Sequence, residues 1–91
     1  MALLKRSTDS LQLNVIARAP FEVYYEGPAF AVTATNRIGV FDVLPEHADF
    51  FSMLIPCEVL IDTGEGEPVS FNINNGIIAV RDNEVMLFVN M

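Results

Sequence analysis

Residues 36–48 have the sequence Asn-Arg-Ile-Gly-Val-Phe-Asp-Val-Leu-Pro-Glu-His-Ala, which combines a turn, a strand pattern and an abrupt stop. The mostly apolar, branched run at residues 40–44 favours a β-strand. Pro45 ends that strand, because proline lacks the N–H that a sheet ladder needs and holds the preceding residue extended. His47, the only histidine of the chain, follows two residues later. The segment therefore predicts short strands separated by tight connections.

Strand patterns lie on both sides of this segment. Apolar and polar residues alternate over residues 11–18, 21–26, 30–35, 58–62 and 69–74, and apolar runs cover 77–80 and 85–89. Connections are expected at Gly27-Pro28, at residues 36–39, 63–68 and 81–84, and at a hairpin turn formed by Asn75-Gly76. Residues 45–53 are compatible with one or two helical turns that tuck Phe50 and Phe51 inward.

These patterns predict an all-β fold, a small β-sandwich or flattened barrel of about eight to ten short strands. A chain of 91 residues has room for one domain, which we assign to residues 11–91, after a loose N-terminus at residues 1–10. The last strand pattern reaches the end of the sequence.

The composition is unusually apolar for a small domain, with 52% hydrophobic residues. A domain of this size buries roughly 60–65% of its surface, so contiguous apolar patches are expected outside, where they usually mark a partner. Tyr24, Met86 and Phe88 lie on the faces opposite the main apolar sets of their strands, and Ile78 and Val80 add to this group. A sheet covered on both faces is indicated, and the cover is either the second sheet or another protein.

The net charge of −7 is unevenly distributed along the chain. From Ala19 onward, Arg37 and Arg81 face eleven acidic residues, which argues against nucleic acid as a partner. Every apolar run is shorter than the roughly 18–20 residues of a membrane span, and the N-terminus does not resemble a secretory signal. We expect a soluble, intracellular protein without direct membrane insertion, compatible with a membrane-bound partner.

The motifs of common enzyme classes are missing from the sequence. It contains no Gly-rich phosphate loop, paired-cysteine metal motif, nucleophile elbow or kinase signature, so no catalytic residue, cofactor or metal ligand is predicted. Cys57, the only cysteine, is interpreted as a small buried apolar residue. A catalytic thiolate would need His47 as its base, and this is the disfavoured alternative.

His47 and Asp42 admit more than one role. His47 is interpreted as a loop residue that hydrogen-bonds to the backbone, with a partner contact, or general-base or metal chemistry with nearby carboxylates, as alternatives. Asp42 is the polar residue of its strand, and an unpaired buried carboxylate would be costly. We expect Asp42 to cap the following turn by accepting N–H groups around Glu46 and His47.

A series of motifs, ordered along nearly the whole chain, resembles one known family. The motifs are Leu13, Val15 and Pro20, then Tyr25-Glu26-Gly27, residues 42–48, Leu54-Ile55-Pro56-Cys57, and an aromatic strand leading into Asn75-Gly76-Ile77. Together they resemble the N-terminal β-sandwich domain of the epsilon subunit of rotary ATP synthases, called delta in mitochondria. The sequence departs from the family at positions that commonly hold glycine, which here are Asp42, Glu46, Cys57 and Asn75. The turn at residues 36–41 also lacks the family's acidic residue. The sequence ends with the last strand pattern, so we expect no counterpart of the family's second domain, a C-terminal helical hairpin.

The resemblance implies a non-catalytic rotor subunit of the central stalk. Such a domain clamps the gamma subunit to the ring of c subunits and couples proton flow to ATP synthesis, at the cytoplasmic side of a bacterial plasma membrane. The implied interface candidates are Asn36, Arg37, Ile38, Gly39, Phe41, His47, Tyr24, Met86 and Phe88, and the implied structural motif residues are Asp42, Pro45, His47 and Gly76. The alternatives are a free-standing β-sandwich adaptor and a small metal-assisted enzyme built on His47.

Overall fold

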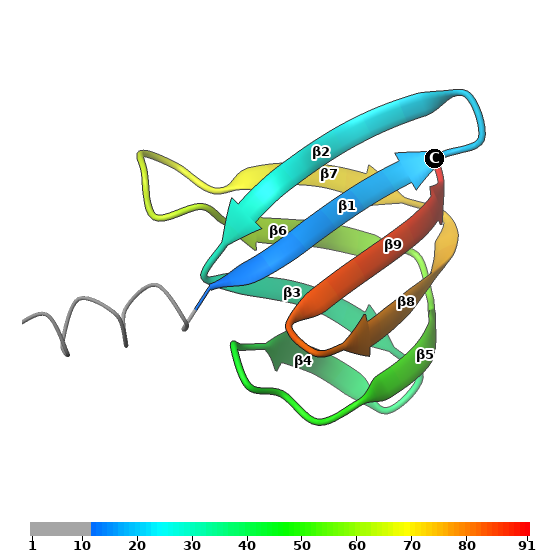
Figure 1. Cartoon of the computed structure of the whole chain (residues 1–91). Helices are drawn as coiled ribbons and strands as arrows, with labels where there is room; N and C mark the ends of the chain where they lie inside the picture. The colour runs from blue at the N-terminus through cyan, green and yellow to red at the C-terminus, as the bar shows by residue number, and fades with distance from the viewer. Residues whose placement is uncertain (1–11) are drawn as a thin grey trace, which may run out of the picture.

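A computed structural model describes residues 12–91, which form nine strands in two sheets. The five-stranded sheet has the order β2-β1-β9-β8-β5 and the four-stranded sheet the order β4-β3-β6-β7 (Figure 1). The strands are β1 Leu13–Ala19, β2 Glu22–Ala29, β3 Ala31–Asn36, β4 Gly39–Val43, β5 Phe50–Leu54, β6 Cys57–Asp62, β7 Val69–Ile73, β8 Asn75–Arg81 and β9 Glu84–Asn90. The all-β sandwich expected from the sequence is confirmed, whereas the loose terminus expected at residues 1–10 lies outside the described residues.

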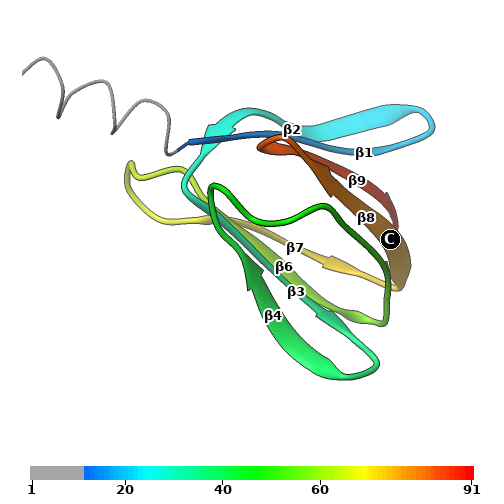
Figure 2. The ribbon, with the colours of Figure 1, turned by 60° about the horizontal axis from the view of Figure 1, so that its bottom comes forward.

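The hydrophobic core lies between the two layers seen in Figure 2. Because successive strand residues point to opposite faces, every second residue of β9 is buried, beginning with Val85 and Leu87. Leu13, Ile61, Ile78 and Leu87 are the bulkiest of the fully buried side chains. Each contributes about 1.5–3 kcal/mol by leaving water. Ile78 and Val80 are also buried and face the core. The prediction that they lie on the same face as Met86 and Phe88 is therefore wrong.

The expected helix at residues 45–53 is also wrong. Residues 44–49 form a loop without regular structure, and β5 begins at Phe50. β5 pairs with β8, with Phe50 opposite Val80 and Phe51 opposite Ala79. The Phe50 ring packs edge-on against Phe41 at 5.3 Å between centroids. Pairing with a strand distant in sequence therefore decides the conformation here, over a locally ambiguous pattern.

Gly27-Pro28 does not form the expected turn, because β2 continues through both residues to Ala29. Pro28 lies opposite Asn14 in the ladder between β2 and β1. β2 is an edge strand of the five-stranded sheet. An edge position tolerates proline, since the N–H that it lacks can be one that would otherwise face solvent.

Asn75-Gly76 does not form a hairpin either, because β7 and β8 belong to different sheets. Gly76 lies inside β8, opposite Val89 on one side and Leu54 on the other. A Cβ atom at this position would lie 2.7 Å from the carbonyl oxygen of Phe88. Glycine is required at residue 76 for a close backbone approach and not for a turn.

The connection expected at residues 81–84 is confirmed as the hairpin between β8 and β9. Its central residues, Asp82 and Asn83, have φ angles of 52° and 64°. Two successive positive φ angles are typical of the two-residue turn that matches the twist of the flanking strands. For Asp and Asn this conformation has a lower energetic cost than for most residues.

The loop after Pro45 is held by Asn83 and not by Asp42. The backbone N–H of Glu46 donates to Oδ1 of Asn83 at 2.6 Å, and the N–H of His47 donates to the carbonyl of Leu44 at 3.1 Å. The Asp42 carboxylate instead accepts from the Thr33 hydroxyl at 2.6 Å, across the ladder between β3 and β4. The expected capping role of Asp42 is therefore wrong, because its side chain points to the outer face of the sheet.

Glu46 has a φ angle of 71°, a left-handed conformation that costs a residue with a side chain roughly 1–2 kcal/mol. The change Glu46→Gly removes this cost and is therefore expected to raise the free energy of unfolding by about 0.5–1 kcal/mol. The increase is smaller than the cost itself, because glycine also gives the unfolded chain more conformational entropy. Urea unfolding followed by circular dichroism measures the effect. Glu46→Ala keeps the Cβ atom and should bring no gain. Equal stability of the glycine and alanine variants would contradict the claim that the left-handed conformation of Glu46 is strained.

Candidate docking surface

The outer faces of the two sheets differ sharply in chemistry. On the four-stranded sheet, most outward residues are polar, among them the hydrogen-bonded pair Thr33 and Asp42, and exposed Glu58, Ser70 and Asn72. Val40, which is 73% exposed, and half-buried Leu60 are apolar residues on the same face. This face resembles an ordinary solvated sheet surface, with polar residues opposite a buried set.

The outer face of the five-stranded sheet is apolar over two neighbouring rows. One row follows the ladder from Ile16 to Met86 and Ala79 and ends at Phe51 on the edge strand β5. The next row runs from Phe88 to Ile77 and Met53. We call these residues, with Val23 on β2, the outer strip: Ile16, Val23, Phe51, Met53, Ile77, Ala79, Met86 and Phe88.

The outer strip crosses all five strands, about 19 Å at the usual strand spacing. Phe51 and Met53 are 67% and 72% exposed, and Phe88 is 45% exposed. Arg18 interrupts the second row between Val23 and Phe88, but its guanidinium donates to the carbonyls of Ala19 and Pro20 along the strand. Contiguous exposed apolar side chains of this extent are typical of a protein-binding surface.

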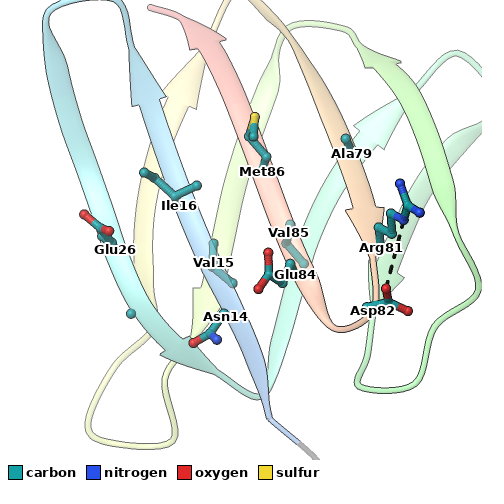
Figure 3. A pocket seen from close by; sticks show the side chains of 11 residues that line it. Asn14, Val15, Ile16, Glu26, Ala79, Arg81, Asp82, Glu84, Val85 and Met86 are labelled. Carbon is teal, nitrogen blue, oxygen red and sulfur yellow. Dashed lines mark ion pairs between the residues drawn. The ribbon is translucent and has the colours of Figure 1, made fainter.

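A shallow groove of about 720 Å³ lies along one border of the outer strip (Figure 3). Ile16, Met86 and Ala79 stand side by side in it, from β1, β9 and β8. Asn14 and Glu84 form the neighbouring polar row. An apolar centre with a polar rim is the usual anatomy of a protein interface.

The residues predicted from the sequence do not form one site. The turn at residues 36–39 precedes β4, whereas His47 follows β4 in the loop next to the β8–β9 hairpin. These two segments therefore lie at opposite ends of the sandwich (Figure 1).

The turn at residues 36–39 is shaped by Asn36. The Asn36 amide oxygen accepts from the N–H groups of Ile38 and Gly39 at 2.9 and 3.2 Å, and its amide nitrogen donates to Ser52 Oγ at 3.1 Å. Gly39 has a φ of 148°, a conformation that side chains rarely adopt. As a result Arg37 and Ile38 project into solvent, and Ile38 is 96% exposed.

The predicted aromatic candidates separate into two groups. Met86 and Phe88 do lie on an outer face, within the outer strip. Tyr24 occupies the bulge of β2 and stacks on Phe71 of the opposite sheet at 5.6 Å between ring centroids. Phe41 packs inward against Phe50, so neither Tyr24 nor Phe41 belongs to an outer face.

Sequence reasoning missed six of the eight residues of the outer strip, namely Ile16, Val23, Phe51, Met53, Ile77 and Ala79. Ile16 is an apolar residue among the polar positions of its strand, Gln12, Asn14 and Arg18, so the alternation alone does not mark it as part of a binding surface. Phe51 and Met53 were hidden in the expected helix. A strand interpretation of residues 50–54 would have placed both on one face, because they are two residues apart.

His47 is a half-buried loop residue whose Nδ1 lies 2.7 Å from the carbonyl oxygen of Ala48 and whose ring packs edge-on against Phe50. This backbone contact agrees with its favoured structural role. Among residues 12–91, no group of three or more His, Cys, Asp or Glu side chains is placed to hold a metal ion. Cys57 is half-buried against the core. Within the same range, no helix is long and apolar enough to cross a membrane.

A family model described as "ATP synthase, Delta/Epsilon chain, beta-sandwich domain" matches residues 10–91. Curated relatives include the "ATP synthase epsilon chain" of Xanthomonas euvesicatoria pv. vesicatoria, 34% identical over 74 residues, which are 81% of this chain and 52% of the relative. The epsilon chain of Xanthomonas campestris pv. campestris (strain B100) is 34% identical over 65 residues, 71% of this chain and 46% of that one. The chain thus spans about half the length of the curated relatives that it matches.

Two solved structures have a similar fold. A chain from the Euglena gracilis mitochondrial ATP synthase, in an assembly of OSCP, F1 and c-ring, superposes with a TM-score of 0.82 at 20% identity, over 89% of this chain and 52% of that one. A chain from the central stalk and c-ring of the Tetrahymena thermophila mitochondrial ATP synthase gives a TM-score of 0.75 at 17% identity, over 87% and 63% of the two chains.

Proposed function

The chain belongs to the ATP synthase delta/epsilon chain family, through its β-sandwich domain, and we propose that it is a non-catalytic subunit of the central stalk of a proton-translocating ATP synthase. In this role it clamps the γ subunit to the ring of c subunits. Rotation of the ring is thereby passed to γ and coupled to ATP synthesis. The protein is then peripheral, on the cytoplasmic side of a bacterial plasma membrane, as part of the complex.

The observation that carries this proposal is the contrast between the two outer faces. The outer strip presents Phe51, Met53 and Phe88 to solvent, whereas the opposite face is mainly polar, apart from Val40 and Leu60. Burial of an apolar surface supplies non-directional attraction in proportion to the area removed from water. A contact held in this way suits a subunit that must stay on the rotor during rotation, and we assign the outer strip to γ.

A second contact surface lies at the end of the sandwich. The turn between β3 and β4 projects Ile38, which is 96% exposed. It lies where β3 ends and β4 begins, next to Phe51 and Met53 at the β5 edge of the outer strip. The packed core makes the domain a rigid body, so the side and the end can hold two different partners in fixed relation. We assign the end that carries residues 36–39 to the c-ring.

The direct test is binding to the γ subunit from the same source. The two purified proteins are mixed and analysed by size-exclusion chromatography with light scattering, and a stable one-to-one complex is expected. Elution of two separate proteins at micromolar concentration would remove γ as the partner. The outer strip could also serve a free-standing adaptor, and that alternative predicts capture of another protein with no binding to γ.

A further inference from the structure

A groove separates the β3–β4 turn from β5, and its walls are apolar. Its volume is about 790 Å³ and it is open to solvent. Ile38 lines one side, Phe51 and Met53 the other, and Ile55 and Pro56 lie in the link between β5 and β6. Phe51 and Met53 also form the β5 edge of the outer strip, so these two residues lie at the boundary between the surface assigned to γ and the surface assigned to the ring.

Arg37 is the only charged residue that lines this groove. Lys5, Arg6 and Asp9 precede the described residues, which contain three arginines and eleven carboxylates. Arg81 lies 4.0 Å from the Asp82 carboxylate and Arg18 donates to backbone carbonyls, but Arg37 makes no ion pair or hydrogen bond with any residue of the 12–91 range. The two uncharged polar side chains of the groove, Asn36 and Ser52, are hydrogen-bonded to each other.

We propose that this groove binds a segment of the c-ring that carries a carboxylate beside apolar side chains, and that Arg37 is the ion-pair partner of that carboxylate. The inference rests on the proposed function and names the chemistry of the surface that the ring presents. A guanidinium binds a carboxylate with two parallel hydrogen bonds, which fixes orientation as well as charge. The apolar walls receive the neighbouring side chains and shield the ion pair from water, which strengthens it.

Charge explains why this contact is specific. The chain as a whole carries a charge of −7, so its electrostatic field repels an acidic partner from most directions of approach. Arg37 offers such a partner a local positive site at one end of the molecule. An acidic segment of the ring is therefore accepted at the groove and repelled elsewhere, which sets the orientation of the domain on the ring.

The test uses the assembled complex of this chain, γ and the detergent-solubilised c-ring from one source. The variant R37K places a primary amine at the groove, and a carbodiimide then joins that amine to a carboxylate in direct contact. Mass spectrometry locates the linkage. We expect residue 37 to be linked to an Asp or Glu of a ring subunit. The matched control R81K places an amine at the opposite end, beside Asp82, and should give no linkage to the ring.

Affinity for the ring gives the second measurement. R37Q is expected to weaken binding of the chain–γ complex to the ring by about 5–10-fold, and R37E by about 10–100-fold, because the reversed charge faces the carboxylate. R81Q should leave this affinity unchanged. Equal affinity of wild type, R37Q and R37E, or linkage of residue 37 to γ or to a second copy of this chain, would overturn the inference alone. Failure of the wild-type chain to join γ or the ring would overturn the proposed function and this inference with it.

Discussion

Phe88→Glu is expected to lower the affinity for the γ subunit by more than about 100-fold while the domain stays folded. Phe88 lies in the middle of the outer strip, between Arg18 on β1 and Ile77 on β8. A carboxylate at this point would be buried in the complex without a partner, and truncating or charging the centre of an interface costs about 2–4 kcal/mol or more. Titration calorimetry with purified γ measures the loss.

A matched control keeps this result specific. Ser70→Glu adds the same charge to an exposed position on the outer face of the four-stranded sheet and should leave the affinity for γ unchanged. Circular dichroism and the unfolding midpoint must show that both variants are folded. Similar losses in the two variants would point to a general charge effect and remove the outer strip as the γ-binding surface.

Leu87→Ala is expected to lower the free energy of unfolding by about 2–5 kcal/mol, the largest stability effect that we predict for a single substitution. Leu87 is fully buried, between Ala17 on β1 and Ile78 on β8. Its loss removes apolar burial and leaves a cavity that the surrounding strands cannot close. Because small domains have about 5–15 kcal/mol of stability, this variant should lose a large share of it.

The adjacent residue provides the comparison for this effect. Phe88→Ala removes a larger side chain, but Phe88 is 45% exposed and should cost less than about 1.5 kcal/mol. Urea unfolding of both variants measures the two losses under one set of conditions. An equal or larger loss for Phe88→Ala would contradict the assignment of Leu87 to the core and Phe88 to the outer face.

Local sequence signals predicted the strands well where the pattern itself carried the information. The period of two in a strand correctly placed Met86 and Phe88 on the face opposite Val85, Leu87 and Val89. Pro45 ended its strand for a reason that lies in proline itself. The two-residue turn at Asp82 and Asn83 followed from residues that tolerate positive φ.

The errors arose where distant parts of the chain decide the structure. Asn75-Gly76 resembles a hairpin turn, but the chain crosses to the other sheet at Asn74 and pairs with β9, a choice that local signals do not contain. The local sequence around Phe50 and Phe51 is compatible with a helix and with a strand. Hydrogen-bonded pairing with β8, which is distant in sequence, selects the strand. The outer strip depends on the register of five neighbouring strands, so only its Met86 and Phe88 could be identified from the sequence.

The most direct test of the γ-binding surface is a methyl NMR spectrum of the labelled domain, recorded before and after addition of unlabelled γ subunit. Ile16, Ile77 and Met86 report on the outer strip, and Leu60 reports on the outer face of the other sheet. We expect the resonances of Ile16, Ile77 and Met86 to shift or broaden while the methyl groups of Leu60 are unaffected. Changes confined to Leu60, or no change at saturating γ, would contradict the assignment of the five-stranded sheet to the rotor.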